Sequence, residues 1–225
     1  MSLGRGDVVG LVGLSGAGKS TLGRLCKGML EAVSGRFYTT ATASDGKRVT
    51  ATLNAAARRP LVGWVEARSE IQLFAESARE ELAFGLRNQG VAGGELERRI
   101  QWALASVGLE SGAFLGRHPR TLSGGEKRRL ALASVAAMDF PYYIFDEPTA
   151  ALDPDGVTAF RDLVSALKER GAGILWMTHD LGGLPGAVDR LALLDRGRLR
   201  LELPAVAVDW ERVARNLSDG RMYVY

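Results

Sequence analysis

One glycine-rich segment constrains the fold of this chain more than any other feature of the sequence. Residues 13–20 read Gly-Leu-Ser-Gly-Ala-Gly-Lys-Ser and match the pattern G-x-x-x-x-G-K-[ST]. The apolar run 8–13 predicts a buried strand, and residues 21–30 predict a helix. A strand, a glycine loop and a helix in this order are the setting that the pattern requires, and they predict an α/β fold with a phosphate-binding loop.

The loop is expected to bind phosphate through its backbone and through two side chains. Glycines let the backbone curl so that consecutive N–H groups face inward at the positive end of the following helix. Lys19 is expected to reach the β- and γ-phosphates of ATP, and the Ser20 hydroxyl is expected to ligate Mg²⁺. A chance glycine-rich turn is the alternative. The predicted nucleotide contacts are Gly13, Leu14, Ser15, Gly16, Ala17, Gly18, Lys19, Ser20 and Thr21.

Two carboxylates follow a second apolar run. Residues 142–145 read Tyr-Tyr-Ile-Phe and predict a buried strand, and Asp146 and Glu147 come directly after it. Ligands of parallel sheets bind at the carboxyl ends of the strands. Asp146 is therefore expected to hold Mg²⁺ through water, and Glu147 is expected to polarise the water that attacks the γ-phosphate. The alternative is an ordinary solvated strand end.

A histidine occupies the same kind of position after another predicted strand. Residues 173–178 are apolar and predict a strand, and His179 follows it. At the carboxyl end of that strand, His179 is expected to contact the γ-phosphate or to hold the attacking water. A purely structural histidine is the alternative.

The remaining pattern predicts a mostly parallel sheet flanked by helices, with a small antiparallel β patch and a helical subdomain at about 75–137. Residues 1–203 are expected to form a single domain, and 204–225 a tail of unknown role. Strands are predicted at 36–43 and 47–53 around Ser44-Asp45-Gly46, at 60–65, and in a hairpin over 191–203; helices are predicted at 77–86, 95–107, 124–138 and 155–170.

Composition excludes several classes of protein. The net charge is only +3 and paired arginines are dispersed among acidic residues, so a nucleic-acid partner is not expected. No apolar run approaches about 18 residues, which disfavours a membrane span, and the start lacks a signal-peptide pattern. A cytoplasmic protein is expected. The lone cysteine, Cys26, is expected to be a small buried apolar residue.

Two further motifs join the phosphate loop and the acidic pair. Leu-Ser-Gly-Gly-Glu at 122–126 precedes Asp-Glu-Pro-Thr at 146–149, and Ala-Leu-Asp at 151–153 follows it. The combination resembles ABC-type ATPases over residues 3–203. The resemblance implies a head-to-tail dimer in which the signature residues of one subunit close over the γ-phosphate held by the other. Those signature residues are Ser123, Gly124, Gly125 and Glu126, the last in place of the usual glutamine, and Asp153 matches the aspartate that communicates across the dimer.

A narrower likeness covers residues 72–74 and 80–86. Gln-Leu-Phe followed by Glu-Glu-Leu-Ala-Phe-Gly-Leu resembles ATPases of energy-coupling factor transporters. This implies an ATPase that works with a transmembrane subunit on the inner face of the cell membrane and energises uptake of a vitamin or transition-metal ion. The alternatives are another ABC importer, a degenerate regulatory partner in an ABC heterodimer, and a soluble ABC ATPase outside transport.

Two departures from the family pattern bear on activity. The family has a glutamine after the strand that corresponds to 62–65, whereas Ala67 occupies that place here, with Glu66 and Gln72 as candidate substitutes. The family also stacks an aromatic residue from ahead of the phosphate loop on adenine, and residues 1–7 contain none. Tyr223 or Tyr225 is the candidate replacement, and a disordered tail is the alternative expectation.

Overall fold

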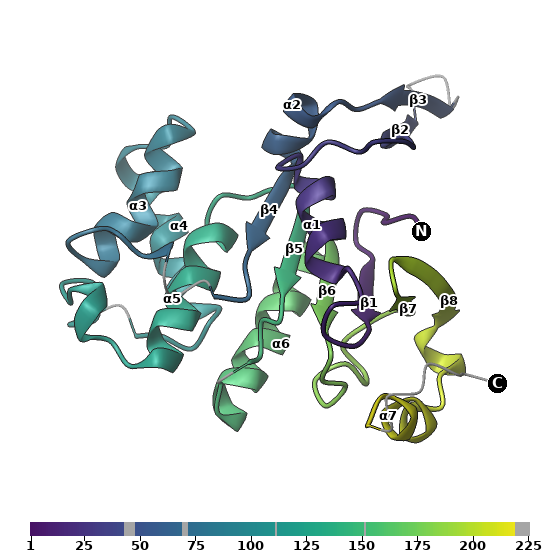
Figure 1. Ribbon diagram of the computed structural model, residues 1–225. Coiled ribbons are helices and arrows are strands. Elements are labelled where there is room, and N and C mark those ends of the chain that lie inside the picture. Colours follow the sequence, from purple (N-terminus) through teal and green to yellow (C-terminus); the bar gives the residue numbers. More distant parts are fainter. Residues whose placement is uncertain (43–47, 69–71, 111, 151, 219–225) are drawn as a thin grey trace.

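A six-stranded sheet forms the centre of the molecule in the computed structural model, which describes residues 1–42, 48–68, 72–110, 112–150 and 152–218 (Figure 1). Its strand order is β4-β5-β6-β1-β7-β8. All neighbours are parallel except β7 and β8, which form an antiparallel pair at the edge. The strands are β1 Val8–Val12, β4 Val62–Val65, β5 Tyr142–Asp146, β6 Gly173–Thr178, β7 Arg190–Asp195 and β8 Arg198–Pro204.

The central strands are apolar along their whole length because helices cover both faces of the sheet. Every residue of β1, β4 and β6 is buried, which explains why these strands show runs rather than alternation. Successive residues point to opposite faces, so Val8 and Val12 enter one apolar cluster while Val9 and Leu11 enter the other. The sheet thus supplies the centre of two cores at once.

The larger helices other than α2 and α7 fall into two groups (Figure 1). Helices α1 and α6 flank the sheet, whereas α3, α4 and α5 form a separate group in which α5 packs against β4. A second sheet of two antiparallel strands lies apart from the first. The elements are α1 Lys19–Lys27, α2 Ala55–Arg58, α3 Ala78–Asn88, α4 Gly93–Ala105, α5 Gly124–Ala136, α6 Pro154–Glu169 and α7 Trp210–Ser218, the short 3-10 turns Arg59–Leu61, Pro119–Thr121 and Ala205–Ala207, and strands β2 Tyr38–Thr42 and β3 Arg48–Thr52.

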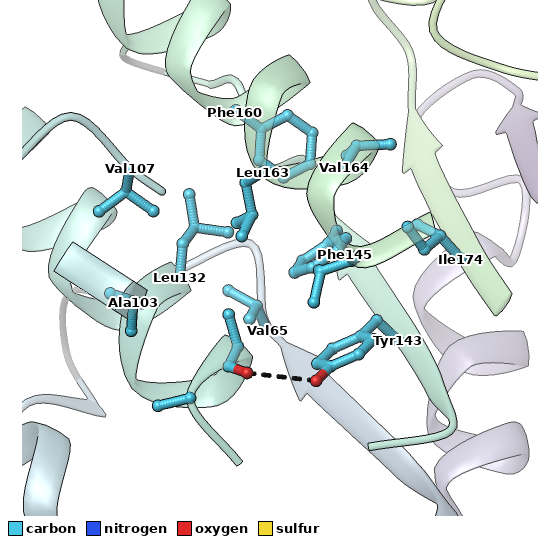
Figure 2. Packing of buried hydrophobic residues seen from close by; sticks show 14 of the residues in the cluster. Val65, Ala103, Val107, Leu132, Tyr143, Phe145, Phe160, Leu163, Val164 and Ile174 are labelled. Carbon is cyan, nitrogen blue, oxygen red and sulfur yellow. Dashed lines mark hydrogen bonds between the residues drawn. The ribbon is translucent and has the colours of Figure 1, made fainter. Parts of the chain in front are cut away.

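The larger core is mostly aliphatic and joins the sheet to α6 and to the helical group, with a few aromatic rings at its centre (Figure 2). The ring of Phe160 on α6 meets Phe145 edge to face at 5.2 Å between centroids and Trp176 at 4.7 Å. The hydroxyl of buried Tyr143 donates to the Ala136 carbonyl at the end of α5 (3.3 Å). This core therefore ties β5, the strand that ends in Asp146, to the helix that begins at the signature motif.

The structure confirms the predicted fold class and most element positions, including the strand at 173–178 and the separate antiparallel pair. The helix predicted at 21–30 was misplaced, because it begins at Lys19 and ends at Lys27. Gly18 and Gly28, with φ of 104° and 78°, end the helix at both sides in left-handed conformations that favour glycine. The predicted turn at Ser44-Asp45-Gly46 lies outside the described residues.

The segment after β8 is more ordered than its sequence pattern suggested. Helix α7 packs Val213 into the core, with Trp210 and Leu217 against its edge. Their spacing of three and four residues is helical, and it was the signal available in the sequence. The domain boundary at 203 stays a prediction. In the described ranges, no helix combines the length and apolarity needed to cross a bilayer.

Candidate active site

The lysine that follows the loop between β1 and α1 forms hydrogen bonds with the backbone of that loop. Lys19 is the first residue of α1 and is 6% exposed. Its Nζ donates to the carbonyl oxygens of Gly13 (2.6 Å) and Leu14 (3.4 Å) on the opposite side of the loop. Positive φ angles at Gly16 (80°) and Gly18 (104°) make the curl possible. The free N–H groups of the first helical turn and the ammonium group therefore lie at the same place, as phosphate binding requires.

The first glycine of the loop is needed because of a neighbouring turn. A β-carbon at Gly13 would overlap the carbonyl oxygen of Leu194 at the end of β7. The turn between β7 and β8 also donates a hydrogen bond from the Gly197 N–H to the Ala17 carbonyl (2.8 Å). The hairpin after β6 thus supports the phosphate loop from outside.

Asp146 is the last residue of β5 and lies next to the loop. It is 3% exposed, and its Oδ1 accepts no hydrogen bond from the described residues. Burial raises the pKa of this carboxyl above its ordinary value, and the charge of Glu147 adds to the increase. The Ser20 hydroxyl, which hydrogen-bonds to Asp146, and the positive charge of Lys19 lower the pKa and partly offset that increase. Because these groups offset the effect of burial only in part, a further cation beside this carboxylate would stabilise its ionised form.

These features fit a magnesium ion. Mg²⁺ is usually held by one or two protein oxygen ligands together with phosphate oxygens and water. Ser20 and Asp146 supply a hydroxyl and a carboxylate in contact with each other, and one carboxylate oxygen is buried without a partner. Within the described ranges, no cluster of three or more His, Cys, Asp or Glu side chains could hold a metal by itself. The Ser20 hydroxyl and the Asp146 carboxylate therefore suit a metal ion whose other ligands are phosphate oxygens and water.

Glu147 is the centre of a hydrogen-bonded group. Its carboxylate accepts from the Thr178 hydroxyl (2.9 Å) and the His179 backbone N–H (3.3 Å), and it lies 2.8 Å from His179 Nδ1. Lys19 Nζ is 3.6 Å from the same carboxylate. The backbone of Glu147 has φ of 49°, which is uncommon for a residue other than glycine. The structure thus brings Lys19, Glu147 and His179 together, as their sequence positions at loop and strand ends suggested.

The signature residues form the start of α5. The Ser123 hydroxyl accepts from the Glu126 N–H (3.2 Å), and the Glu126 carboxylate accepts from the Ser123 N–H (2.7 Å), which completes a capping box. Arg117 holds the Glu126 carboxylate with a hydrogen bond of 2.6 Å. Figure 1 shows the start of α5 apart from the loop between β1 and α1 of the same chain. The two motifs do not form one site within this subunit.

Other expected residues have local roles. The Asp153 carboxylate caps α6 by accepting from the Gly156 N–H (2.8 Å). Glu66, near the position of the missing glutamine, lies 3.9 Å from the Arg24 guanidinium, and Gln72 is exposed. Tyr223 and Tyr225 lie outside the described residues.

Sequence reasoning missed two residues of the site. Thr178 ends β6 and donates to the Glu147 carboxylate (2.9 Å). Arg128, on α5, is 3% exposed and reaches the backbone around Glu147. Thr178 could have been found as the polar residue that closes an apolar strand. Nothing local marks Arg128, which lies in a run of basic residues that reads as a solvated helix face.

Comparisons with known proteins agree with this geometry. The family model described as ABC transporter matches residues 1–150. The energy-coupling factor transporter ATP-binding protein EcfA2 of Symbiobacterium thermophilum is 36% identical over 210 residues, which cover 93% of this chain and 70% of that protein.

Two solved structures share the fold. One is the structure of cbiO1 from Clostridium perfringens, which is part of the ABC transporter complex cbiONQ. It has a TM-score of 0.77 at 30% sequence identity, and the match covers 96% of this chain and 85% of the cbiO1 chain. The other is the ATP-binding cassette MJ0796, solved as a dimer in a post-hydrolysis state with ADP and Pi. It has a TM-score of 0.76 at 26% sequence identity, and the match covers 91% of this chain and 88% of the MJ0796 chain.

Proposed function

This chain belongs to the family of ABC transporter ATP-binding subunits, which are ATPases, and we propose that it hydrolyses ATP in the site formed by the phosphate loop, Asp146, Glu147 and His179. The observation that supports this most directly is the meeting of Lys19, Glu147 and His179 at the carboxyl ends of three parallel strands. That edge of an α/β sheet is where ligands bind.

In the first step the loop binds the phosphates of ATP. Backbone N–H groups of the first turn of α1 donate to phosphate oxygens, and Lys19 exchanges its bonds to Gly13 and Leu14 for the β- and γ-phosphates. Ser20 and Asp146 would hold Mg²⁺, which when bound neutralises developing charge on the phosphates. Leu14, Ser15, Gly16, Ala17, Gly18 and Thr21 complete the proposed contacts around the nucleotide.

In the second step the Glu147 carboxylate orients water for attack on the γ-phosphorus and accepts a proton from it. The Thr178 hydroxyl and the His179 N–H fix the orientation of this carboxylate. Movement of Lys19 toward phosphate removes the ammonium group that now lies 3.6 Å from one Glu147 carboxylate oxygen. The His179 side chain is 57% exposed, and its proposed role is to contact the γ-phosphate or to hold the attacking water.

The signature residues complete a neighbouring site in a dimer. Ser123, Gly124 and Gly125 present a helix start with a hydroxyl and free N–H groups, which suits a phosphate. Since this surface lies apart from the chain's own loop, we infer that it closes over ATP held by a second subunit. Asp153 lies at the start of α6, close in sequence to Glu147, and is proposed to contact that partner.

We propose an importer of the energy-coupling factor type, with a transmembrane partner at the inner membrane face, and the names of EcfA2 and of the cbiONQ complex support the type of transporter. The proposed solute, a vitamin or transition-metal ion, rests on the sequence resemblance alone. The aromatic pair Phe74 and Phe84 supports such a partner. These rings are 63% and 50% exposed and meet edge to face at 4.8 Å. Exposed paired aromatic rings favour a protein contact.

A second candidate is a regulatory subunit that binds nucleotide but turns it over poorly beside a more active partner. Ala67 favours this candidate, because it replaces a side chain that the family uses near the metal. Magnesium-dependent hydrolysis by the purified chain alone, at a rate of at least one turnover per second, contradicts the regulatory role.

The test of the proposed catalytic role is Glu147→Gln. The amide keeps the size of the side chain but cannot accept a proton, so turnover should fall by at least about 100-fold while ATP binding is retained. Phosphate release and calorimetric ATP titration measure the two properties. Glu110→Gln, an exposed substitution on another surface, is the matched control and should change neither. Unchanged turnover in Glu147→Gln contradicts the role of Glu147.

A further inference from the structure

The guanidinium of Arg128 lies where three parts of the site meet. Arg128 belongs to the second turn of α5, the helix that starts with the signature residues, and is almost fully buried at 3% exposure. Its nitrogens donate to backbone carbonyl oxygens of Glu66 (3.0 Å), Ala67 (2.7 Å), Asp146 (3.2 Å), Glu147 and Pro148 (3.3 Å). One side chain thus joins α5, the segment after β4 and the acidic end of β5.

Only an arginine can make this set of contacts. The guanidinium is planar, remains charged, and carries five N–H donors in a fixed fork, whereas a lysine ammonium has three donors on one atom. Acceptors on two separate chain segments therefore require the fork. Carbonyl oxygens around a buried cation also share its charge, which holds their peptide planes in place.

The contact matters most at Glu147. This residue has φ of 49°, and a non-glycine residue stays in such a conformation only where its surroundings impose it. Its N–H donates to the Met177 carbonyl (2.8 Å), and its own carbonyl accepts from Arg128. The two bonds hold the Glu147 peptide groups from both sides. They leave the carboxylate directed at Thr178 and His179.

We propose that Arg128 is a positioning residue for ATP hydrolysis, which holds the backbone of Glu147 so that its carboxylate faces the γ-phosphate site. This inference rests on the role proposed above for Glu147. Arg128 itself touches neither nucleotide nor water in this role. It acts through the peptide groups of Asp146, Glu147 and Pro148, and it fixes their position relative to the helix that carries Ser123.

The experiment compares Arg128→Met and Arg128→Lys with Arg129→Met. The adjacent Arg129 donates only to the Gly108 carbonyl (3.2 Å) at the surface among its described contacts, so its variant is the matched control. Turnover is normalised to ATP-binding sites counted by titration, which removes any unfolded fraction from the comparison. We expect Arg128→Met to lower kcat by at least about 10-fold with KM within about twofold. Arg128→Lys should recover part of kcat, and Arg129→Met should match the parent.

The outcomes separate positioning from a merely structural role. If Arg128→Met keeps full kcat per binding site and only melts earlier, or if KM rises while kcat is unchanged, the proposal is wrong. Should Arg128→Met fail to fold, Arg128→Lys decides, because it keeps a buried cation: full kcat in this variant overturns the proposal, and a reduced kcat at unchanged KM supports it. Glu147→Gln is measured in parallel. Full activity in that variant would contradict the proposed role of Glu147 as the base, which is the proposed function, rather than the positioning role of Arg128.

Discussion

Two glycines determine how closely the elements around this site approach one another, because each lacks a side chain at a point of close contact. Glycine at position 23 lets α1 lie directly on the sheet, since a β-carbon there would overlap the indole ring of Trp64 on β4 and come within 2.9 Å of the Met177 methyl group. Gly13 has the same function against the Leu194 carbonyl. Both glycines therefore set the position of the phosphate loop relative to the sheet.

We predict that Gly23→Ala lowers the free energy of unfolding by about 1–3 kcal/mol, because a buried methyl group would displace α1 or Trp64. ATP affinity should fall with it, since Lys19 and Ser20 belong to the same helix. Urea denaturation and ATP titration measure the two effects.

Gly94→Ala is the matched control for that substitution. Gly94 also lies in a helix, but a β-carbon there meets nothing within 4 Å. This variant should be as stable as the parent or more stable by no more than about 1 kcal/mol, because alanine favours helix over glycine. Equal stability losses at the two positions would contradict the packing explanation.

At the scale of elements, the start of α5 depends on an ionised side chain. The hydrogen bond from Arg117, and next the one from the Ser123 N–H, lower the pKa of the Glu126 carboxyl below its usual value. Because folding lowers this pKa, ionised Glu126 stabilises the fold above about pH 4.3, the pKa of the unfolded side chain. That stabilisation is lost as the pH falls through the lower pKa of the folded state.

Glu126→Gln should therefore lower stability by about 0.5 kcal/mol at pH 7, since the amide keeps one acceptor for Ser123 but loses the ion pair with Arg117. The difference from the parent should shrink as the pH falls below about 4. Urea denaturation of both proteins from pH 7 to pH 3.5 checks this dependence. A difference that grows on acidification would refute the assignment of the charge, and Glu110→Gln should show no trend.

At the scale of the whole molecule, the separation of α5 from the phosphate loop supports the proposal that two subunits share each site, and a dimer of two copies of this chain predicts the result of mixing two variants. Lys19→Ala removes the phosphate lysine from one subunit, and Ser123→Arg blocks the signature surface of another. Each variant alone should be inactive. A mixture should recover up to about a quarter of the parent activity, because half of the randomly formed dimers are mixed and each contains one intact site of two.

Phosphate release after mixing the two variants measures this recovery. ATP titration of Ser123→Arg provides the control, since its own loop is intact and should bind ATP with the parent affinity. A mixture that stays inactive would contradict a site shared between copies of this chain and favour a different partner subunit.

The sequence by itself determined the parts of this protein whose interactions are local. The phosphate loop depends on glycines and on a lysine within one short segment, and the caps of α5 and α6 join residues three positions apart. Alternating apolar strands and helices also predicted the parallel sheet. These features were predictable because backbone angles and nearest hydrogen bonds depend on neighbours in the chain.

Tertiary structure alone decided which distant segments meet. The pairing of β1 with β6, the convergence of Thr178 and His179 on Glu147, and the reach of Arg128 to the backbone beside two strands all join residues far apart in sequence. A side chain interacts only over a few ångströms, and its sequence position does not specify what the fold brings within that distance. Arg128 accordingly resembles a surface arginine in the sequence and becomes a buried one only when α5 packs against β4.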